Sequence, residues 1–224
     1  MAAAFTLVLE TSTPHASVAL VSPDGSIEQR TFHSDRNHNA LLFGPLDELL
    51  SSRARGNIGL VLVGSGPGSY SGTRVGIAAA QGVAIASGCP VVALPSLLAV
   101  PSAVDGGRCL AVGDARRGSY WLAEIGNHSM KSEPALCDAG GFEAALAESP
   151  DLPVISFEDP SRYPAGSGRI QLEFPDAAGL WRVWSATPEA EREAYAAAPP
   201  QPLYLKPPHI TPAKRPWWTP KESV

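Results

Sequence analysis

Cysteine, aromatic side chains and positive charge are all scarce in this sequence of 224 residues. Its three cysteines, Cys89, Cys109 and Cys137, lie far apart and form no CxxC pair, which argues against both a disulfide framework and a zinc knuckle. A reducing cytosol is the simplest environment for such a chain. Only 7% of the residues are aromatic, so Ala, Val and Leu must provide most of the packing within a normal hydrophobic content of 44%.

Basic residues are outnumbered, with 17 Lys and Arg against 22 Asp and Glu, and the formal net charge is −5. This balance argues against a free-standing nucleic-acid-binding protein, which usually carries a basic surface. Long apolar runs are missing as well, since no run approaches the roughly 20 residues of a membrane span. The start of the chain has no basic residues and meets Glu10 too early for a signal peptide. The sequence therefore predicts a cytoplasmic protein that does not contact a membrane.

Glycine, in contrast, is concentrated in one segment, residues 64–82, with the sequence GSGPGSYSGTRVGIAAAQG. The segment follows an apolar run and leads into small residues, which predicts a strand, a turn and then a helix over about 73–87. Such a turn either holds an anion with its free N–H groups or lets a helix begin at a tight angle. The residues that define the turn and the start of the helix are Gly66, Gly68, Ser69, Gly72 and Arg74.

Known phosphate and nucleophile motifs do not fit this turn. No Lys follows the last glycine as in a Walker A loop, and the glycine spacing is not GxGxxG. No acid lies about twenty residues further on to bind a ribose. Tyr70 occupies the middle of GSYSG, where the GxSxG motif requires Ser. Because a lone glycine-rich turn is a weak motif, the spacing favours a structural turn, with an anion site as the alternative.

The helix that follows has Gly or Ala at every fourth residue, which permits a second helix to approach closely. With so few polar side chains, this helix is either buried in the domain or covered by a partner. Arg74 is the one charged residue in its first turn, where a cation opposes the helix dipole. We expect a carboxylate or carbonyl partner for Arg74, with a solvated side chain as the alternative.

The remaining patterns predict an α/β chain that contains a weak internal repeat. Strands are expected at 5–10, 16–21, 27–32, 60–63 and 91–94, and leucines at helical spacing predict a helix before Gly56. The segments LVLETSTPHASVAL and LAVGDARRGSYWLAEI both indicate a strand, an acid, a polar turn and a strand. Glu10 and Asp114 occupy matching places in them, which predicts two related lobes that face one another.

Patterns weaken beyond residue 126. A helix is expected after Pro95-Ser96, another at 142–147, a strand at 154–157, and an acidic surface helix at 188–198 with a capping signal at Thr187. Eight prolines in 196–224 predict an extended tail. The tail combines charge with aromatic stacking surface, a mixture that can bind single-stranded RNA; a disordered tail, or one whose tryptophans pack back on the domain, is the alternative. The residues concerned are Lys214, Arg215, Trp217 and Trp218.

The signature GPGSYSGTRVGIAAAQGVA resembles that of the TsaB (YeaZ) family. The resemblance extends to LVLETSTPHASVALV, RNHNALLFGPLDELL, PVVALPSLLAV, GDARRGSYWLAE and PLYLKP, and it is dense over residues 5–125. It implies an α/β chain with the two-lobed actin/Hsp70/sugar-kinase (ASKHA) fold, built from ribonuclease-H-like sheets with helices. The expected parts are a partner-binding first lobe at 1–106, a reduced second lobe at 107–206 and a Pro-rich basic and aromatic tail at 207–224.

The resemblance implies a non-catalytic subunit required for N6-threonylcarbamoyladenosine (t6A) at position 37 of tRNA. Such a subunit binds and supports the catalytic paralogue TsaD together with the ATPase TsaE, and contacts tRNA only through the complex. ATP and metal would belong to the partner subunits, and the chain would form a homodimer when alone. The implied partner surface lies on two helices of the first lobe, with Leu42, Leu46 and Leu49 on one and Val75, Ala79 and Val83 on the other.

The residues leave a second function open, a stand-alone Mg-ATP-dependent ATPase or kinase. Glu10 and Asp114 are the candidate cofactor-binding residues, because two carboxylates that face a cleft can hold hydrated Mg²⁺. The alternative is that both acids cap strand ends by binding backbone N–H groups. The usual residue of the family at the first position is Asp, so Glu10 is a departure. Arg116 and Arg117 could pair across the lobes or contact RNA phosphate, and a surface ion pair is the simpler expectation.

A metallopeptidase is a third hypothesis, and the spacing of the histidines argues against it. His33 and His38 are five residues apart, a spacing that turns a helix by roughly 500° and puts the two side chains on different faces. His15, His128 and His209 are isolated in the sequence. No metal site and no catalytic residue are therefore expected in this chain.

Overall fold

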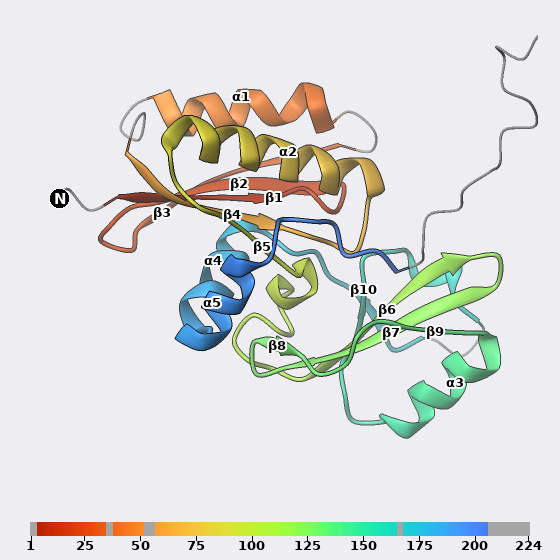
Figure 1. Cartoon of the computed structure of the whole chain (residues 1–224). Helices are drawn as coiled ribbons and strands as arrows, with labels where there is room; N and C mark the ends of the chain where they lie inside the picture. The colour runs from red at the N-terminus through yellow and green to blue at the C-terminus, as the bar shows by residue number, and fades with distance from the viewer. Residues whose placement is uncertain (1–3, 35–37, 52–56, 165–167, 206–224) are drawn as a thin grey trace, which may run out of the picture.

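The computed structural model describes residues 4–34, 38–51, 57–164 and 168–205. Two β-sheets form the two lobes, and helices cover their faces (Figure 1). The predicted signals at Gly56 and in the tail 207–224 lie outside the described residues. Within the described ranges, no helix combines the length and the apolar character needed to cross a membrane.

The first sheet has five strands in the order β3-β2-β1-β4-β5. Strand β1 pairs antiparallel with β2 and parallel with β4, and its alternating side chains are buried on both faces of the sheet. Leu7 and Leu9 pack towards the two long helices α1 and α2, whereas Val8 packs on the opposite side. The bounds are β1 (Phe5–Glu10), β2 (His15–Val21), β3 (Ile27–His33), β4 (Ile58–Gly64), β5 (Val91–Leu94), α1 (His38–Ser51) and α2 (Tyr70–Ser87).

The second sheet repeats this topology, with short strands at its edges. Its order is β11-β10-β6-β7-β8, and β9 also pairs with β7. Strand β6 pairs antiparallel with β7 and parallel with β10, as β1 does with β2 and β4. The helix α3 packs against β7 and β9. The bounds are β6 (Cys109–Arg116), β7 (Ser119–Gly126), β8 (Ser129–Met130), β9 (Ala135–Cys137), β10 (Val154–Ser156), β11 (Ile170–Leu172) and α3 (Ala139–Glu148).

The duplicated strand order confirms the fold expected from the sequence. The hairpins β1–β2 and β6–β7 contain the two matching acids, and each opens a ribonuclease-H-like sheet. The second lobe is the smaller, since β8, β9, β10 and β11 have only two or three residues each. The two-lobed α/β architecture with a reduced second lobe is therefore correct.

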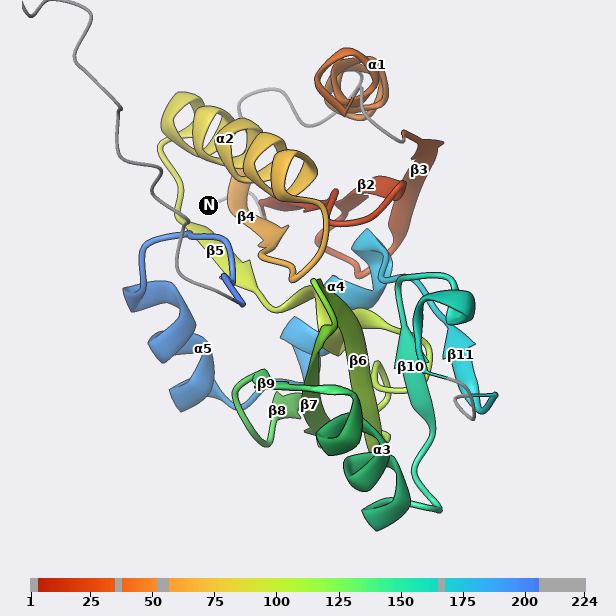
Figure 2. The ribbon, with the colours of Figure 1, turned by 90° about the vertical axis from the view of Figure 1, so that its right-hand side faces the viewer.

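Two further helices, which carry the chain back to the first sheet, are α4 (Ala177–Ala186) and α5 (Glu189–Ala197). Helix α4 packs against β1 and β4, and α5 packs against β5, on the face opposite α1 and α2 (Figures 1 and 2). The N–H of Ala177 donates to Ser17 Oγ at 2.9 Å, which ties the start of α4 to β2. The bounds 1–106 and 107–206 stay a prediction, but both helices lie on the first sheet although they fall within 107–206.

Three local predictions need correction. Helix α2 begins at Tyr70, three residues before the expected start, because Ser69 caps it. The helix expected after Pro95 is a single 3₁₀ turn, Ser96–Ala99. Thr187 does not cap α5 but ends α4, where its hydroxyl donates to the carbonyl of Val183 at 2.7 Å. Helix α4 itself was not predicted.

Candidate functional site

The glycine-rich turn between β4 and α2 packs closely against the turn between β1 and β2. A Cβ on Gly68 would overlap the carbonyl oxygen of Ser12, and a Cβ on Gly76 would overlap Thr11 Oγ1. The N–H of Ser69 donates to the Ser12 carbonyl at 2.6 Å, and Thr11 Oγ1 donates to the Gly72 carbonyl at 2.8 Å. Close packing of two turns thus explains these glycines without an anion.

Backbone conformation adds to this requirement. Gly66 and Gly68 have φ values of +86° and +155°, a range that side-chain-bearing residues rarely adopt. The side chain of Ser69 then accepts a hydrogen bond from the N–H of Gly72 at 3.1 Å, which caps α2. A Cβ on Gly64, at the end of β4, would overlap the Glu10 carboxylate. Glycine is therefore needed at several points around the Glu10–Thr13 turn.

Glu10 and Asp114 make the same local contact in the two lobes. Glu10 Oε1 accepts a hydrogen bond from the N–H of Ser12, and Asp114 Oδ1 accepts one from the N–H of Arg116, both at 2.7 Å. Each acid thus closes the turn that follows the first strand of its sheet. The two differ in burial, because Glu10 is fully buried and the Asp114 side chain is 18% exposed.

Burial raises the pKa of the Glu10 carboxyl, against the hydrogen bonds at Ser12, which lower it. Among the described residues, Glu10 Oε2 has no hydrogen-bond partner. An ionised Glu10 is therefore an unfavourable buried charge in the folded chain.

We expect Glu10→Gln to stabilise the chain increasingly as the pH rises. Because the folded-state pKa is raised above the ordinary value of 4.5, the folded chain binds the proton more tightly, and stability falls as pH rises through the folded pKa. Each pH unit between the folded and unfolded pKa values is worth about 1.4 kcal/mol. Urea unfolding of both proteins between about pH 5 and pH 8 measures the difference. A difference that does not change with pH would contradict this expectation.

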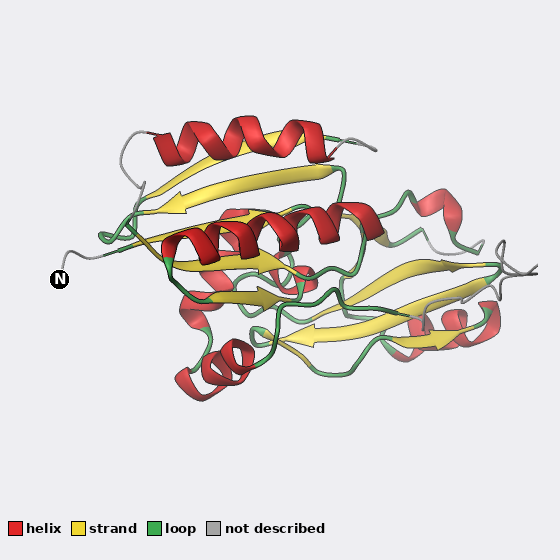
Figure 3. Ribbon diagram, turned by 45° about the horizontal axis from the view of Figure 1, so that its top comes forward, coloured by secondary structure: helices red, strands yellow, loops and turns green. Residues whose placement is uncertain are grey.

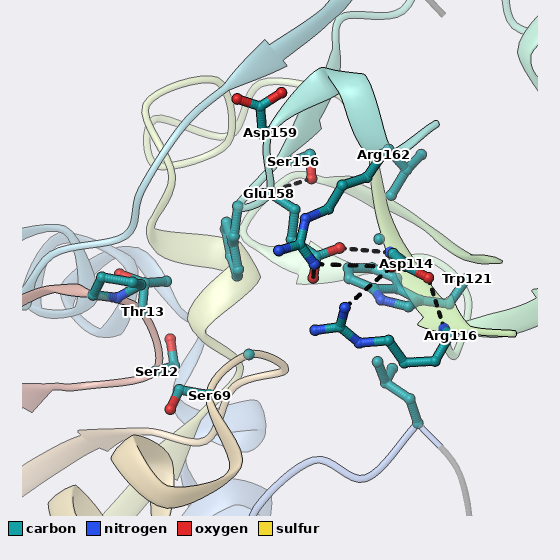
Figure 4. A pocket seen from close by; sticks show the side chains of 16 residues that line it. Ser12, Thr13, Ser69, Asp114, Arg116, Trp121, Ser156, Glu158, Asp159 and Arg162 are labelled. Atoms are coloured by element: carbon teal, nitrogen blue, oxygen red, sulfur yellow. Dashed lines mark hydrogen bonds and ion pairs between the residues drawn. The ribbon is translucent and has the colours of Figure 1, made fainter. Parts of the chain in front are cut away.

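A cavity of about 420 Å³ lies between the lobes and is lined by both (Figure 4). Ser12, Thr13 and Ser69 line the first-lobe side, where Figure 4 shows them across the cavity from Asp114. Glu10 does not line the cavity, so the two candidate acids do not face one another across it. The residues that line the second-lobe side include Asp114, Arg116, Trp121, Ser156, Glu158 and Arg162.

Asp114 is engaged by groups of its own lobe. Its carboxylate pairs with Arg116 at 3.4 Å and Arg162 at 3.9 Å, and its N–H donates to Glu158 Oε2 at 2.7 Å. The ion pair between Arg116 and Asp114 lies within one turn and does not cross the lobes. It is the local surface ion pair that was the simpler expectation. The ring of Trp121 covers Gly113, where a Cβ would overlap it.

No group of three or more His, Cys, Asp or Glu side chains in the described ranges is arranged to hold a metal ion. His33 lies opposite His15 on β2 and β3, with ring centroids 4.9 Å apart. The side chain of His38 lies outside the described part.

The outer face of α1 and α2 carries an apolar groove of about 720 Å³. The two helices lie side by side over the first sheet, with their outer surfaces away from the second lobe (Figure 3). Val75, Ala79 and Val83 of α2 are half-buried and line the groove. The other lining residues are Phe43, Leu46, Arg74, Ala78 and Gly82.

Of the three leucines expected on this partner surface, two do not reach the groove. Leu42, Leu46 and Leu49 are buried in the core between α1 and the sheet, and of these Leu46 alone lines the groove. Sequence reasoning missed Leu41 and Phe43, which are 41% and 57% exposed on α1. The signal was the unbroken apolar run at 41–43, which gives α1 apolar side chains on two faces.

Arg74, at the end of the groove, binds a phenol, whereas a carboxylate or carbonyl was expected. Its Nη2 donates to the hydroxyl of Tyr204 at 2.7 Å. Its guanidinium carbon lies 4.2 Å from the ring centroid of Tyr70 and 5.8 Å from that of Tyr204. The neighbouring Leu203 N–H donates to the Ser65 carbonyl at 2.8 Å, and Leu205 packs on the second-lobe core. Residues 203–205 therefore connect the two lobes beside the glycine-rich turn.

Comparison with known proteins agrees with this architecture. A family model described as "TsaD: tRNA N6-adenosine threonylcarbamoyltransferase" matches residues 27–139, about half of the chain. The "tRNA threonylcarbamoyladenosine biosynthesis protein TsaB" of Haemophilus influenzae is 26% identical over 211 residues, which cover 89% of this chain and 82% of that protein. The Escherichia coli protein of the same name is 30% identical over 124 residues, 53% of each chain.

Among solved structures, YeaZ from Pseudomonas aeruginosa superposes with a TM-score of 0.69 at 22% identity, over 90% of this chain and all of that one. This likeness supports the fold, and the sequence matches carry the family assignment. The chain belongs to the family that the model describes and, within it, to the TsaB (YeaZ) family.

Proposed function

We propose that this chain is a non-catalytic subunit required for t6A modification of tRNA, which binds and supports a TsaD-like catalytic subunit together with a TsaE-like ATPase. Membership of the TsaB family supports a role in t6A biosynthesis, because the curated relatives are named for that pathway. The family model, described for TsaD, supports a TsaD-like paralogue as the partner.

The apolar groove between α1 and α2 is the observation that carries the proposal. A groove of about 720 Å³ with half-buried Val75 and Val83 leaves apolar surface open to solvent, a feature typical of interaction sites. Phe43 and Ile85, 57% and 82% exposed, extend the apolar surface of the two helices. A partner built on the same fold would present matching helices, and a second copy of this chain would use the same face when alone.

The chemistry of the interlobe region speaks against the alternative, a stand-alone Mg-ATP-dependent enzyme. Mg²⁺ in nucleotide sites is held by one or two accessible carboxylates together with waters and the substrate phosphates. Glu10 is buried away from the cavity, and Asp114 is engaged by Arg116 and Arg162. The proposal therefore assigns ATP and metal to the partner subunits, contact with tRNA to the assembled complex, and the work of the chain to the cytoplasm.

An omission experiment tests the function. A mixture of the TsaD-like subunit, the TsaE-like ATPase, an enzyme that supplies threonylcarbamoyl-adenylate, tRNA and this chain is expected to form t6A, detected by nucleoside mass spectrometry. The mixture without this chain is expected to lose that activity, and this chain with ATP and tRNA alone to form no t6A. Full t6A formation without the chain, or steady ATP hydrolysis by the chain alone, would overturn the proposal.

A further inference from the structure

We propose that Arg74 selects the partner, by binding a carboxylate on the partner helix that occupies the α1–α2 groove. This inference rests on the proposed function, in which the TsaD-like subunit fills the groove. The partner must then offer a carboxylate as well as an apolar surface, which makes Arg74 a specificity-determining residue.

Arg74 is the one charged side chain among the described residues that line the groove. It lies in the first turn of α2, where the helix dipole adds further positive potential. Its hydrogen-bond partner, Tyr204, is a neutral phenol, and no carboxylate pairs with Arg74 within the described part of the chain. The positive charge at this end of the groove is therefore uncompensated, and charge complementarity calls for an acidic group on the occupant.

Tyr70 and Tyr204 hold the Arg74 guanidinium in a position where it can bind a carboxylate of the partner. The ring of Tyr70 lies 4.2 Å from the guanidinium carbon, and Tyr204 fixes one of its five N–H donors, which leaves the others available for a carboxylate. Both tyrosines are open to solvent, at 63% and 47% exposure. A held arginine between exposed aromatic rings loses little freedom on binding, and Tyr and Arg are the residue types that dominate interface energies.

Residues 203–205 are part of this arrangement. The Leu203 N–H is bonded to Ser65, and Leu205 is packed on the second lobe, so Tyr204 is held between two anchored neighbours. Tyr204 is a positioning residue in this account, because it acts through Arg74.

Affinity for the purified TsaD-like subunit, measured by calorimetry at low and high salt, tests the inference. Arg74→Gln is expected to weaken binding roughly tenfold or more and to reduce its salt dependence. Arg74→Lys keeps the charge but loses the planar fork, so it should fall between Gln and the wild type. Tyr204→Phe keeps the ring and should weaken binding only slightly.

Arg192→Gln is the matched control, since Arg192 also lies over an aromatic ring, 5.7 Å from that of Trp184, but on α5 on the other face of the sheet. It is expected to bind as the wild type does, and urea unfolding confirms that every variant is folded. If Arg74→Gln binds with the affinity and salt dependence of the wild type while Val83→Glu does not bind, the role of Arg74 is overturned and the interface is kept. Normal binding by Val83→Glu would instead overturn the α1–α2 groove as the interface, whereas failure of the wild-type chain to bind the TsaD-like subunit would overturn the proposed function.

Discussion

Val83→Glu is expected to abolish association with the TsaD-like subunit. Val83 lines the α1–α2 groove and is half-buried beside the core of the first lobe. A partner helix in the groove would cover the new carboxylate, and burial of an unpaired charge in an apolar interface costs several kcal/mol. Since about 1.4 kcal/mol corresponds to a factor of ten, affinity should fall more than about 100-fold. Co-purification and calorimetry measure the loss.

Two further variants separate loss of the interface from loss of the fold. Ala78→Glu places the charge on an exposed residue that lines the groove, where it leaves the core intact. It should abolish association with little change in stability. Gln81→Glu adds the same charge at an exposed position of α2 that does not line the groove, and it should bind normally. Normal association of Val83→Glu and Ala78→Glu would show that the partner docks elsewhere.

Gly76→Ala is expected to destabilise the chain by about 1–3 kcal/mol. Its methyl group would overlap Thr11 Oγ1, a fully buried hydroxyl that donates to the Gly72 carbonyl. Forced overpacking costs about 1–3 kcal/mol, and loss of the hydrogen bond adds about 1 kcal/mol, which is offset by the gain of about 1 kcal/mol from alanine as the better helix former. The free energy of unfolding in urea reports the change.

Gly82→Ala supplies the control, because Gly82 lies in the same helix with no atom near the added methyl group. Alanine is the better helix former by about 1 kcal/mol, so this variant should be slightly more stable than the wild type. Equal destabilisation by both substitutions would mean that helix conformation, and not the contact with the β1–β2 turn, explains the glycine at 76.

The repeated fold could be predicted from the sequence because its signals are local. Each lobe begins with an apolar strand, an acid, a polar turn and a second strand, and the acids Glu10 and Asp114 close the turns as expected. The glycine-rich turn packs closely on the β1–β2 turn, which agrees with its interpretation as a structural turn. Its reason, the close approach of Thr11 and Ser12 from some sixty residues away, depends on tertiary contacts that spacing does not reveal.

The features that were missed depend on how elements pack. Helical spacing identifies the leucines of α1 but not the face that the sheet buries, so Leu42 and Leu49 were assigned outward and Leu41 was overlooked. Tyr204, the partner of Arg74, is 130 residues away in the chain. Helix α4 is the exception, because its cap at Asp176 and the helical spacing of its buried residues Ala177, Leu180 and Val183 were local signals that the sequence analysis overlooked.

Formation of t6A in the reconstituted mixture, compared between Ala78→Glu and Gln81→Glu, measures whether the chain supports modification by presenting the α1–α2 groove to the catalytic subunit. We expect Gln81→Glu to support t6A formation at the wild-type rate and Ala78→Glu, although folded, to support none. A wild-type rate of t6A formation with Ala78→Glu would show that the catalytic subunit does not dock in this groove.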